Sequence, residues 1–381
     1  MDRIVVVGAG LAGGVAVATL REHGFRGRIT LIGEEKTPPY SRPPLSKQYL
    51  RGEHALPELV NPASTYADVD LKLETRAMRI DPKAKRVLLE SGEEVLYDRL
   101  LVATGGRNRS IDAPGILQLR TIEDSNRIRA AARPGSRAVI VGMGFIGCEV
   151  AASLRQLGVE VTAIARGNGL LASVLGEEVG AELAKIHREH GVRLLLDDAV
   201  TRFEGHRVHT RRGMIIDCDF VIGAIGIVPN VELLAEAGAA IENGVLIDEL
   251  FHTTLPDVYA AGDIANIEHH VFGRSRVEHW NNAFHQGRSV ALSMLGEGKP
   301  FDYIHTIWSD QYEHSIEYVG YAPIWDQVKL DGSLASRRCL VSYFREGRLQ
   351  AVMGLNRGGD PEEAREGELK AFIPLIDRTA R

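Results

Sequence analysis

The sequence predicts an α/β fold in which two copies of a strand–turn–helix–strand unit precede a smaller C-terminal α+β domain. Three observations support this prediction. A glycine-rich turn occurs twice, each copy follows a β-branched run, and the pattern changes to alternating strands from about residue 306. The length of 381 residues also exceeds what one compact core usually holds, so two or three domains are expected.

The first unit spans residues 3–34 and begins with the β-branched run Ile4–Val7. The turn over residues 8–13 reads G-A-G-L-A-G, and a helix and the strand Arg28–Ile32 follow it. Glycine allows the backbone to turn tightly beside a pyrophosphate, and the N–H groups that open the helix attract phosphate. We therefore expect Gly8, Gly10, Ala12 and Gly13 to form part of a dinucleotide-binding site.

The second unit repeats this order at residues 137–166. Val139–Val141 precedes the turn G-M-G-F-I-G at residues 142–147, and a helix and the strand Val159–Ile164 follow. One such turn is weak evidence, because its glycines can serve helix–strand packing alone. Two turns in the same context favour two dinucleotide-binding domains of the Rossmann type.

The remaining segments are assigned more coarsely. Residues 71–103 and 200–223 each resemble a small antiparallel meander. The expected strands are Arg86–Leu89, Glu94–Tyr97 and Arg99–Ala103 in the first, and Arg207–Thr210, Met214–Ile216 and Asp219–Gly223 in the second. A short helix after 230, a strand at Gly244–Ile247 and a long helix near His279–Leu295 come next. The C-terminal domain is expected to consist of strands and a last helix. These are Ile316–Val319, Arg337–Phe344, Leu349–Met353 and a helix near Pro361–Phe372.

Composition excludes several classes of protein. The formal net charge of −6 shows no basic excess, which argues against a nucleic-acid binder. No apolar run reaches the ~18 residues of a membrane span, and the chain passes from Met1 directly into a strand, so a cytoplasmic location is expected. The three cysteines form no C-x-x-C pair, which argues against a disulfide scaffold, a zinc site or a cysteine-bound iron–sulfur cluster. We predict no metal site.

Several motifs together resemble those of the FAD-dependent ferredoxin reductases of bacterial oxygenase and cytochrome P450 systems. This family shares the glutathione-reductase architecture, and the resemblance covers nearly the whole chain. The segments that carry it are Val7–Gly13, Tyr40–Lys47, Ala103–Gly106, Gly142–Glu149, Ala261–Asp263 and Trp308–Tyr312. R-P-P-L-S-K and W-S-D-Q-Y are the specific ones. The resemblance implies a discontinuous FAD-binding domain at 1–112 and 240–305, an NAD(P)H-binding domain at 113–239 and a C-terminal domain at 306–381.

The expected FAD site combines spacing with this resemblance. Glu34 lies 21 residues after Gly13, where an acid can bind the adenosine ribose. Glu35 is the alternative ligand of the ribose. Glu34 can also be an ordinary surface glutamate at a turn. The resemblance places Lys47 near the flavin, Asp263 at its ribityl chain and Trp280 beside its ring. A solvated lysine, a helix-capping aspartate and a core tryptophan are the respective alternatives. The remaining positions implied for FAD are Arg42, Pro43, Ala77, Ala103, Thr104, Gly105 and Arg120.

The expected nucleotide site lies at the second turn. The turn and the resemblance together imply contacts from Gly142, Gly144, Phe145, Ile146, Glu149 and Gly226, and the charge of Arg166 makes it a further candidate. We expect Glu149 to orient the nicotinamide and, with Lys47, to be catalytic, although it can also be an ordinary helix glutamate. At the end of the second strand the family usually carries an acid for NADH, and here Ala165 and Arg166 replace it. Arginine can bind a 2′-phosphate, which favours NADPH, unless Arg166 only stacks on adenine.

The function implied is transfer of a hydride from NAD(P)H to FAD, followed by single-electron transfer to a [2Fe–2S] ferredoxin. Residues 37–50 lack the cysteines that related disulfide reductases carry beside the flavin, so electrons should pass directly to a docked acceptor. Six cations against three acids within 324–358 form either a docking face or a solvated one. A rubredoxin reductase, an NAD(P)H oxidase and a redox-responsive binding protein similar to apoptosis-inducing factor are the competing hypotheses. The protein is expected to be a monomer or a homodimer.

Overall fold

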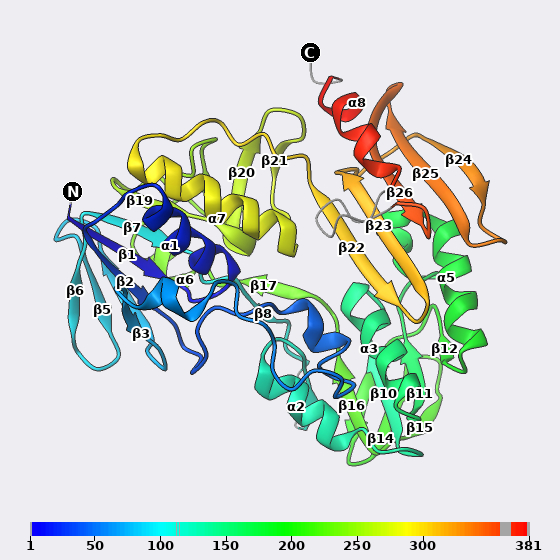
Figure 1. The fold of residues 1–381 in the computed structure, drawn as a ribbon. Helices are drawn as coiled ribbons and strands as arrows, with labels where there is room; N and C mark the ends of the chain where they lie inside the picture. Colours follow the sequence, from blue (N-terminus) through cyan, green and yellow to red (C-terminus); the bar gives the residue numbers. More distant parts are fainter. Residues whose placement is uncertain (1, 112, 114, 359–366, 379–381) are drawn as a thin grey trace.

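The computed structural model describes residues 2–111, 113, 115–358 and 367–378. It contains two parallel five-stranded sheets and one antiparallel five-stranded sheet, each with its own covering helices (Figure 1). This arrangement confirms the predicted fold class. Among the described residues, no helix combines the length and the apolar character that crossing a membrane requires.

The first sheet has the strand order β19-β7-β1-β2-β3, and all its neighbours run parallel. Its strands are β1 (Arg3–Val7), β2 (Arg28–Ile32), β3 (Asp70–Lys72), β7 (Arg99–Val102) and β19 (Val258–Ala260). The helices α1 (Leu11–Glu22) and α7 (Trp280–Leu295) cross closely over it, because Gly287 presents no side chain to the α1 backbone. A Cβ at that position would lie 2.5 Å from the Ala12 carbonyl oxygen.

The second sheet repeats this plan with the order β12-β11-β10-β16-β9, again parallel. Its strands are β9 (Ile116–Leu117), β10 (Arg137–Val141), β11 (Glu160–Ile164), β12 (Arg193–Leu195) and β16 (Phe220–Gly223). Its helices are α2 (Ile122–Ala131), α3 (Phe145–Gln156), α4 (Ala172–Leu175) and α5 (Glu177–Glu189). An antiparallel pair, β8 (Gly106–Asn108) and β17 (Ile227–Pro229), joins the two units.

Both predicted meanders exist, but their membership was partly wrong. The expected outer strands near 99–103 and 219–223 are β7 and β16, which belong to the parallel sheets. Each meander instead begins with a strand that the sequence analysis missed. The meanders consist of β4 (Ala77–Asp81), β5 (Arg86–Leu89) and β6 (Glu94–Leu96), and of β13 (Val200–Glu204), β14 (Arg207–Thr210) and β15 (Ile215–Asp217).

Short elements complete the first unit around the end of its sheet. These are η1 (Pro43–Ser46), η2 (Ala63–Tyr66), α6 (Glu232–Glu236), β18 (Val245–Ile247), η3 (Gly262–Ile264), β20 (Ala265–His269) and β21 (Gly273–Ser275). β18, β20 and β21 form a separate small sheet. The predicted short helix, the strand near 244–247 and the long helix that ends at Leu295 are therefore confirmed.

The C-terminal sheet has the order β22-β23-β26-β25-β24 and is antiparallel throughout. Its strands are β22 (Thr306–Gln311), β23 (His314–Gly320), β24 (Gln327–Ser333), β25 (Arg338–Arg345) and β26 (Arg348–Leu355). The strands β22 and β24 were not predicted from the sequence. Within the range Pro361–Phe372 expected for the last helix, the short helix η4 (Leu369–Phe372) forms the end, and α8 (Ile373–Arg378) follows directly beyond it. Residues 361–366 of that expected helix lie outside the described residues.

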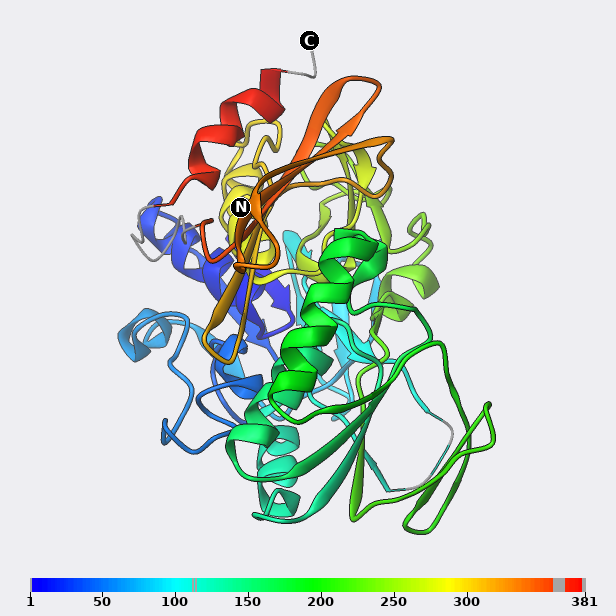
Figure 2. The ribbon, with the colours of Figure 1, turned by 90° about the vertical axis from the view of Figure 1, so that its right-hand side faces the viewer.

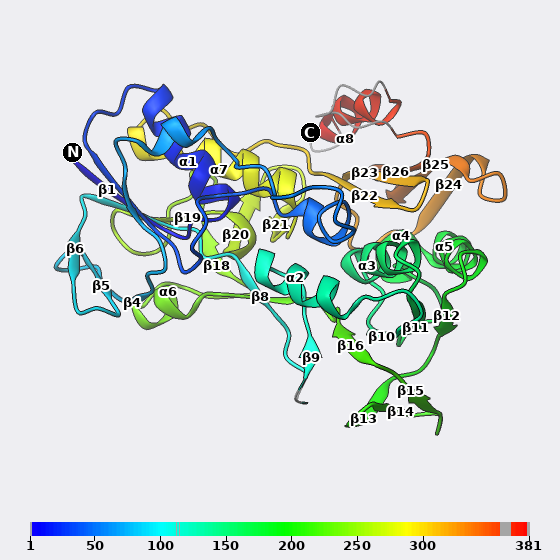
Figure 3. The same ribbon diagram turned by 60° about the horizontal axis from the view of Figure 1, so that its bottom comes forward.

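The C-terminal sheet is the middle of a three-layer stack. Figure 3 shows α8 on one side of it and α3, α4 and α5 of the second unit on the other. In Figure 2 the green helix α5 runs toward the orange strands, and the Tyr343 hydroxyl donates a hydrogen bond of 2.7 Å to the Leu175 carbonyl. One continuous apolar cluster contains buried residues of the second unit, the C-terminal sheet and the segment 40–50. These parts therefore share a core.

Candidate functional site

The two glycine-rich turns have the same geometry. Gly8 has φ 118° and Gly142 has φ 97°, a region in which only glycine is unstrained. A Cβ on Gly8 would lie 2.2 Å from the Ala103 carbonyl oxygen, and one on Gly142 would lie 2.4 Å from the Ala224 carbonyl oxygen. Each turn is thus pressed against the end of the neighbouring strand, and any larger residue would displace it.

The helices after these turns begin without a capping side chain. Gly10 precedes α1 and Gly144 precedes α3, and a Cβ on either would meet nothing within 4 Å. By contrast, α2 carries a complete capping box between Thr121 and Asp124, and His279 caps α7. The first-turn N–H groups of α1 and α3 therefore face open space, as a phosphate-binding helix terminus requires.

The two acids after β2 have different surroundings. Glu35 accepts a hydrogen bond of 2.5 Å from Arg42 and one of 2.7 Å from the Tyr40 hydroxyl. Glu34 is 70% exposed, and among the described residues its ion-pair partner is Arg76, at the long distance of 3.4 Å. Glu35 thus holds the following loop, while Glu34 is available to a ligand at the end of the first sheet.

Charged side chains connect the predicted positions Arg42, Arg120 and Asp263. Arg42 donates a hydrogen bond of 2.6 Å to the Arg120 carbonyl, and the Arg120 guanidinium binds the Asp263 carboxylate at 2.8 Å. Asp263 lies in η3, directly after the strand β19. The structure brings these three residues together from parts of the chain that are far apart in sequence.

Lys47 and Glu149 form a buried ion pair between the two units. The Lys47 ammonium lies 3.0 Å from the Glu149 carboxylate, and their side chains are 8% and 5% exposed. The hydroxyls of Ser46 and Ser309 also donate to Glu149, at 2.5 Å and 2.8 Å. An unpaired charge at this depth would be costly, and these donors satisfy the carboxylate. Three parts of the chain therefore meet at one side chain.

A chain of buried hydrogen bonds continues from Ser309. Gln311 donates to the Ser309 hydroxyl at 3.3 Å, and its oxygen lies 3.0 Å from Nε2 of His187. The Tyr312 hydroxyl lies 3.2 Å from Nδ1 of the same ring. Burial lowers the pKa of His187 to about 4. A neutral ring that carries its proton on Nε2 gives every bond in this chain a donor and an acceptor.

Sequence reasoning missed four of these polar residues. Ser46, Ser309 and Gln311 lie within the R-P-P-L-S-K and W-S-D-Q-Y segments, which signalled the family without assigning a role to each side chain. His187 lies on α5, more than 120 positions before Gln311. Nothing in the local sequence marks it, because its partners come from another sheet.

Aromatic rings gather where α7 meets the C-terminal sheet. Trp280 stacks on Phe284 with ring centroids 5.4 Å apart and meets Trp308 edge-on at 5.8 Å. Its indole Nε1 is buried and has no hydrogen-bond partner among the described residues. The same is true of Oδ1 of Asn281. A donor and an acceptor therefore remain available beside these rings.

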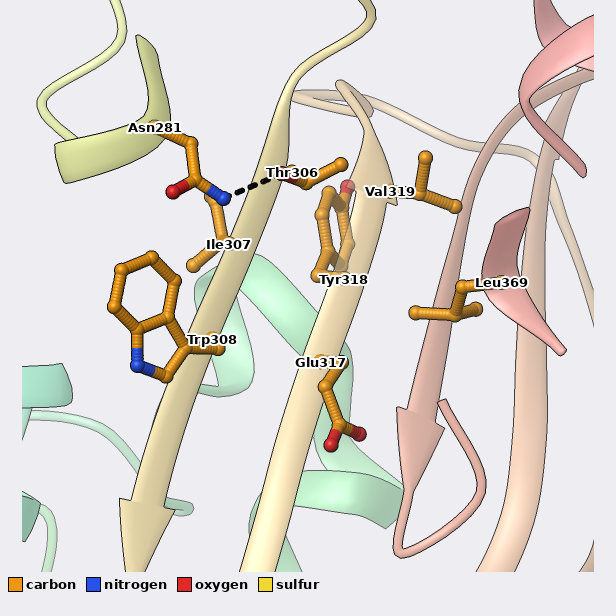
Figure 4. Close-up of a pocket in the computed structure, with 8 residues that line it drawn as sticks. All are labelled: Asn281, Thr306, Ile307, Trp308, Glu317, Tyr318, Val319 and Leu369. Carbon is orange, nitrogen blue, oxygen red and sulfur yellow. Dashed lines mark hydrogen bonds between the residues drawn. The ribbon is translucent and has the colours of Figure 1, made fainter. Parts of the chain in front are cut away.

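One cavity adjoins the aromatic cluster, and a second adjoins the Lys47–Glu149 pair. Figure 4 shows the smaller one, where Asn281 points to Thr306 and Trp308 and Glu317 also contribute to the wall. Its volume of about 10 Å³ suits one water molecule and no ligand. The larger is a cleft of about 320 Å³ that lies against the Lys47–Glu149 pair.

The other predicted residues lie around the two turns. Ala103, Thr104 and Gly105 follow β7, and Ala77 opens β4 next to the first sheet. Pro43 begins η1, Phe145 and Ile146 open α3, and Gly226 precedes β17 with φ 93°. Ala165 and Arg166 follow β11. Arg166 is exposed and forms no ion pair within the part of the chain that the structure describes.

The structure offers no reactive thiol next to the ion pair. All three cysteines are buried and free. Cys148 directly precedes Glu149 in the sequence, but its thiol donates a weak hydrogen bond to the Met143 carbonyl. Burial raises the pKa of this thiol. No group of three or more potential metal ligands exists among the described residues.

The basic residues of 324–358 do not form a free cluster. Arg337 is bound to Glu182 and Glu189 of α5, and Arg357 is bound to Asp331 and Glu368. These pairs neutralise two of the six cations and join the C-terminal sheet to its neighbours. These ion pairs therefore argue against the hypothesis that all six cations form a docking face.

Comparisons with known proteins agree with this architecture. The family model of pyridine nucleotide-disulphide oxidoreductases matches residues 2–287, and the reductase C-terminal model matches residues 306–367. The biphenyl dioxygenase system ferredoxin--NAD(+) reductase component of Paraburkholderia xenovorans (strain LB400) is 36% identical over 93% of this chain and 90% of its own length. Putidaredoxin reductase of Pseudomonas putida is 34% identical over 93% of this chain and 89% of its own length.

A solved structure gives the same answer. The crystal structure of the covalent putidaredoxin reductase–putidaredoxin complex superposes with a TM-score of 0.93 at 33% identity, over 99% of this chain and 93% of that one. The resemblance seen in the sequence is thereby confirmed. This chain belongs to the pyridine nucleotide-disulphide oxidoreductase family and is an oxidoreductase related to the ferredoxin reductases of oxygenase and cytochrome P450 systems.

Proposed function

We propose that this protein carries electrons from a pyridine nucleotide, through FAD, to a [2Fe–2S] ferredoxin that serves an oxygenase or a cytochrome P450. The observation that carries the proposal is the buried Lys47–Glu149 pair, which joins the first unit to the helix that follows the second glycine-rich turn. A hydride donor on the second unit and an acceptor on the first would meet beside it.

The residues present fit a flavin dinucleotide on the first unit. The uncapped N-terminus of α1 suits a pyrophosphate, Glu34 suits the adenosine ribose, and Asp263 suits the ribityl chain. The unpartnered Nε1 of Trp280 offers a hydrogen-bond donor to such a ligand. When bound, the flavin supplies the exchange between a two-electron donor and one-electron acceptors.

The protein's own groups would bind, orient and neutralise. Lys47 places a positive charge next to the reacting ring, and Ser46, Ser309 and Lys47 hold Glu149 so that it can orient the nicotinamide. The Arg120–Asp263 ion pair would hold the part of the flavin site that contains Asp263. We assign these roles to an FAD-binding domain of 1–112 and 240–305, an NAD(P)H-binding domain of 113–239 and a C-terminal domain of 306–381. The helix α6 is the exception to these bounds, because its buried leucine packs in the core of the first unit.

The cysteine chemistry supports direct transfer to a protein acceptor. A disulfide substrate needs an accessible thiolate as nucleophile, whereas the one cysteine next to Glu149 is buried and its pKa is raised. Electrons would therefore leave without a thiol relay. Several relatives are ferredoxin reductases by name, and one related structure contains putidaredoxin.

We also propose NADPH as the preferred donor. Arg166 is exposed at the end of β11 without an ion pair within the described ranges, and Ala165 presents no carboxylate to repel a 2′-phosphate. The names of several relatives specify NAD(+), so the two nucleotides must be compared directly. A cytoplasmic location and a monomeric or homodimeric state belong to the same proposal.

Anaerobic reduction tests the proposal. The purified protein should show a flavin spectrum that NADPH bleaches faster than NADH, and added [2Fe–2S] ferredoxin should then support reduction of cytochrome c. Turnover of equal rate without ferredoxin would favour the oxidase hypothesis. Bleaching with neither nucleotide would refute the proposal and favour a redox-responsive binding protein.

A further inference from the structure

We propose that the cleft against the Lys47–Glu149 pair is a proton exit, with Glu149 at its inner end and Gln156 at its mouth. The inference rests on the proposed function and adds to it the path of the proton. It follows from the stoichiometry of the reaction and from the side chains that line the cleft.

The reaction must release one proton for each hydride. A pyridine nucleotide delivers two electrons and one proton together, whereas a one-electron acceptor removes electrons alone. With ferricyanide as acceptor the balance is NADPH + 2 ferricyanide → NADP⁺ + H⁺ + 2 ferrocyanide. The proton starts at a site that is buried within the protein, so it needs a group that accepts it and a path to solvent.

The buried carboxylate is placed to accept it. Glu149 is 4% exposed and lies 3.0 Å from Lys47, in the region assigned to hydride transfer. Ser309 fixes the Oε1 atom of Glu149, while Oε2 is the oxygen that Ser46 and Lys47 share. In this step the bond that holds the proton to the reduced cofactor would break as an O–H bond forms on Glu149. That O–H bond would then break as the proton passes to water in the cleft.

The cleft leads from this carboxylate to the surface. Its wall includes Glu149, Ala152, Ser153 and Gln156 of α3. Ala152 and Ser153 lie three and four positions after Glu149, and Gln156 lies four and three positions after them, so the four residues share one face of the helix. Seven residues of helix span about 10 Å, and they run from the buried Glu149 to the exposed Gln156. Exposed Glu313 also lines the cleft.

The cleft has the size and chemistry of a water path. A volume of about 320 Å³ can hold several water molecules. Most of its lining side chains are polar or charged; besides Glu149 they include Lys47, Arg51, Tyr312 and His314. A binding site for a small organic molecule would be largely apolar. The hydrogen-bond chain from Ser309 to His187 passes through a glutamine amide, which conducts protons poorly, so that chain positions Glu149 and the cleft carries the proton.

The first test obstructs the mouth. The flavin-loaded protein is reduced anaerobically with one equivalent of NADPH and mixed with ferricyanide in weak buffer, and flavin absorbance and an indicator dye are followed together. Gln156→Trp should delay the proton behind the electrons by about tenfold, equivalent to about 1.4 kcal/mol of barrier. Gln156→Ala, the matched control, should release both together. Ala152→Leu, which narrows the middle of the cleft, should behave like Gln156→Trp.

Two further measurements separate obstruction from general damage. The midpoint potential of the flavin should be the same in Gln156→Trp and wild type at every pH, because an obstruction changes a rate and leaves the equilibrium unaltered. In Glu149→Gln the proton should lag even with an open cleft. Added acetate should restore its release there, and should fail to do so in the Glu149→Gln, Gln156→Trp double variant.

The inference is overturned if proton and electrons leave Gln156→Trp and Ala152→Leu together, or if acetate rescues the single and double variants equally. Ferricyanide replaces the protein acceptor in these experiments, so the outcome does not depend on which ferredoxin is the partner. Failure of NADPH and NADH to bleach the flavin would instead refute the proposed function before this test begins.

Discussion

Acid should destabilise this protein through His187 in a way that one substitution can isolate. His187 is fully buried between α5 and β22, and burial lowers its pKa to about 4 from an ordinary value near 6.5. Between these two values the unfolded chain binds the proton and the folded chain does not. Stability is therefore complete above about pH 6.5 and is lost as the pH falls toward 4.

The size of the effect follows from the two pKa values. At pH 5 the unfolded ring is mostly protonated and the folded ring mostly neutral, which costs about 2 kcal/mol relative to pH 7.5. A glutamine at this position has no charge to gain. The variant His187→Gln should therefore lose about 2 kcal/mol less than wild type between pH 7.5 and pH 5, whatever its stability at neutral pH.

Urea unfolding at both pH values measures this difference of differences. Carboxylates elsewhere contribute to the acid loss in both proteins and cancel in the comparison. His206→Gln, at an exposed site, is the matched control and should follow wild type. Equal acid losses in wild type and His187→Gln would refute the reasoning, since they would mean that the buried ring does not resist protonation.

Four other outcomes are expected. Ser309→Ala, which removes a donor from a buried carboxylate, should cost about 1–3 kcal/mol in urea unfolding, and Ser309→Thr should recover part of it; no loss would contradict the geometry. Thr121→Ala should cost about 1 kcal/mol by removing the α2 capping box, as thermal unfolding will show. Gly142→Ala should abolish nucleotide binding in calorimetry but leave flavin retained, because the added Cβ meets the Ala224 carbonyl oxygen; unchanged affinity would count against the turn. Arg166→Ala should raise KM for NADPH about tenfold more than KM for NADH, and equal changes would remove the argument for a 2′-phosphate.

The sequence was sufficient for features whose signal is local. Both dinucleotide units were found because a β-branched strand, a glycine-rich turn and a helix are contiguous in the chain. The strands β7 and β16 were assigned to the wrong sheets, because their own residues do not reveal whether their partners are parallel strands far along the chain. β24 was missed because every one of its residues is exposed, which leaves no alternation to detect.

The candidate site shows the same limit. Lys47 and Glu149 could be singled out by resemblance, but their 3.0 Å ion pair joins segments about 100 positions apart and is a property of the fold. His187 and Gln311 were not foreseen at all, because a buried polar pair is defined by its neighbours and those come from different sheets. The sequence likewise does not distinguish Glu34 from Glu35 as the ribose ligand. The two acids differ because Arg42 and Tyr40 donate hydrogen bonds to Glu35 in the folded protein.

The carboxylate of Glu149 also determines how the molecule can move. It is held at once by Ser46 and Lys47 of the first unit and by Ser309 of the C-terminal sheet, and it belongs to a helix of the second. A hinge motion between any two of these parts would have to break the same few buried bonds. The protein should therefore act as a single mechanical body, in which the distances between these three parts stay constant. Turnover would then be governed by the arrival and departure of partners, and a new acceptor could be accommodated by surface substitutions alone.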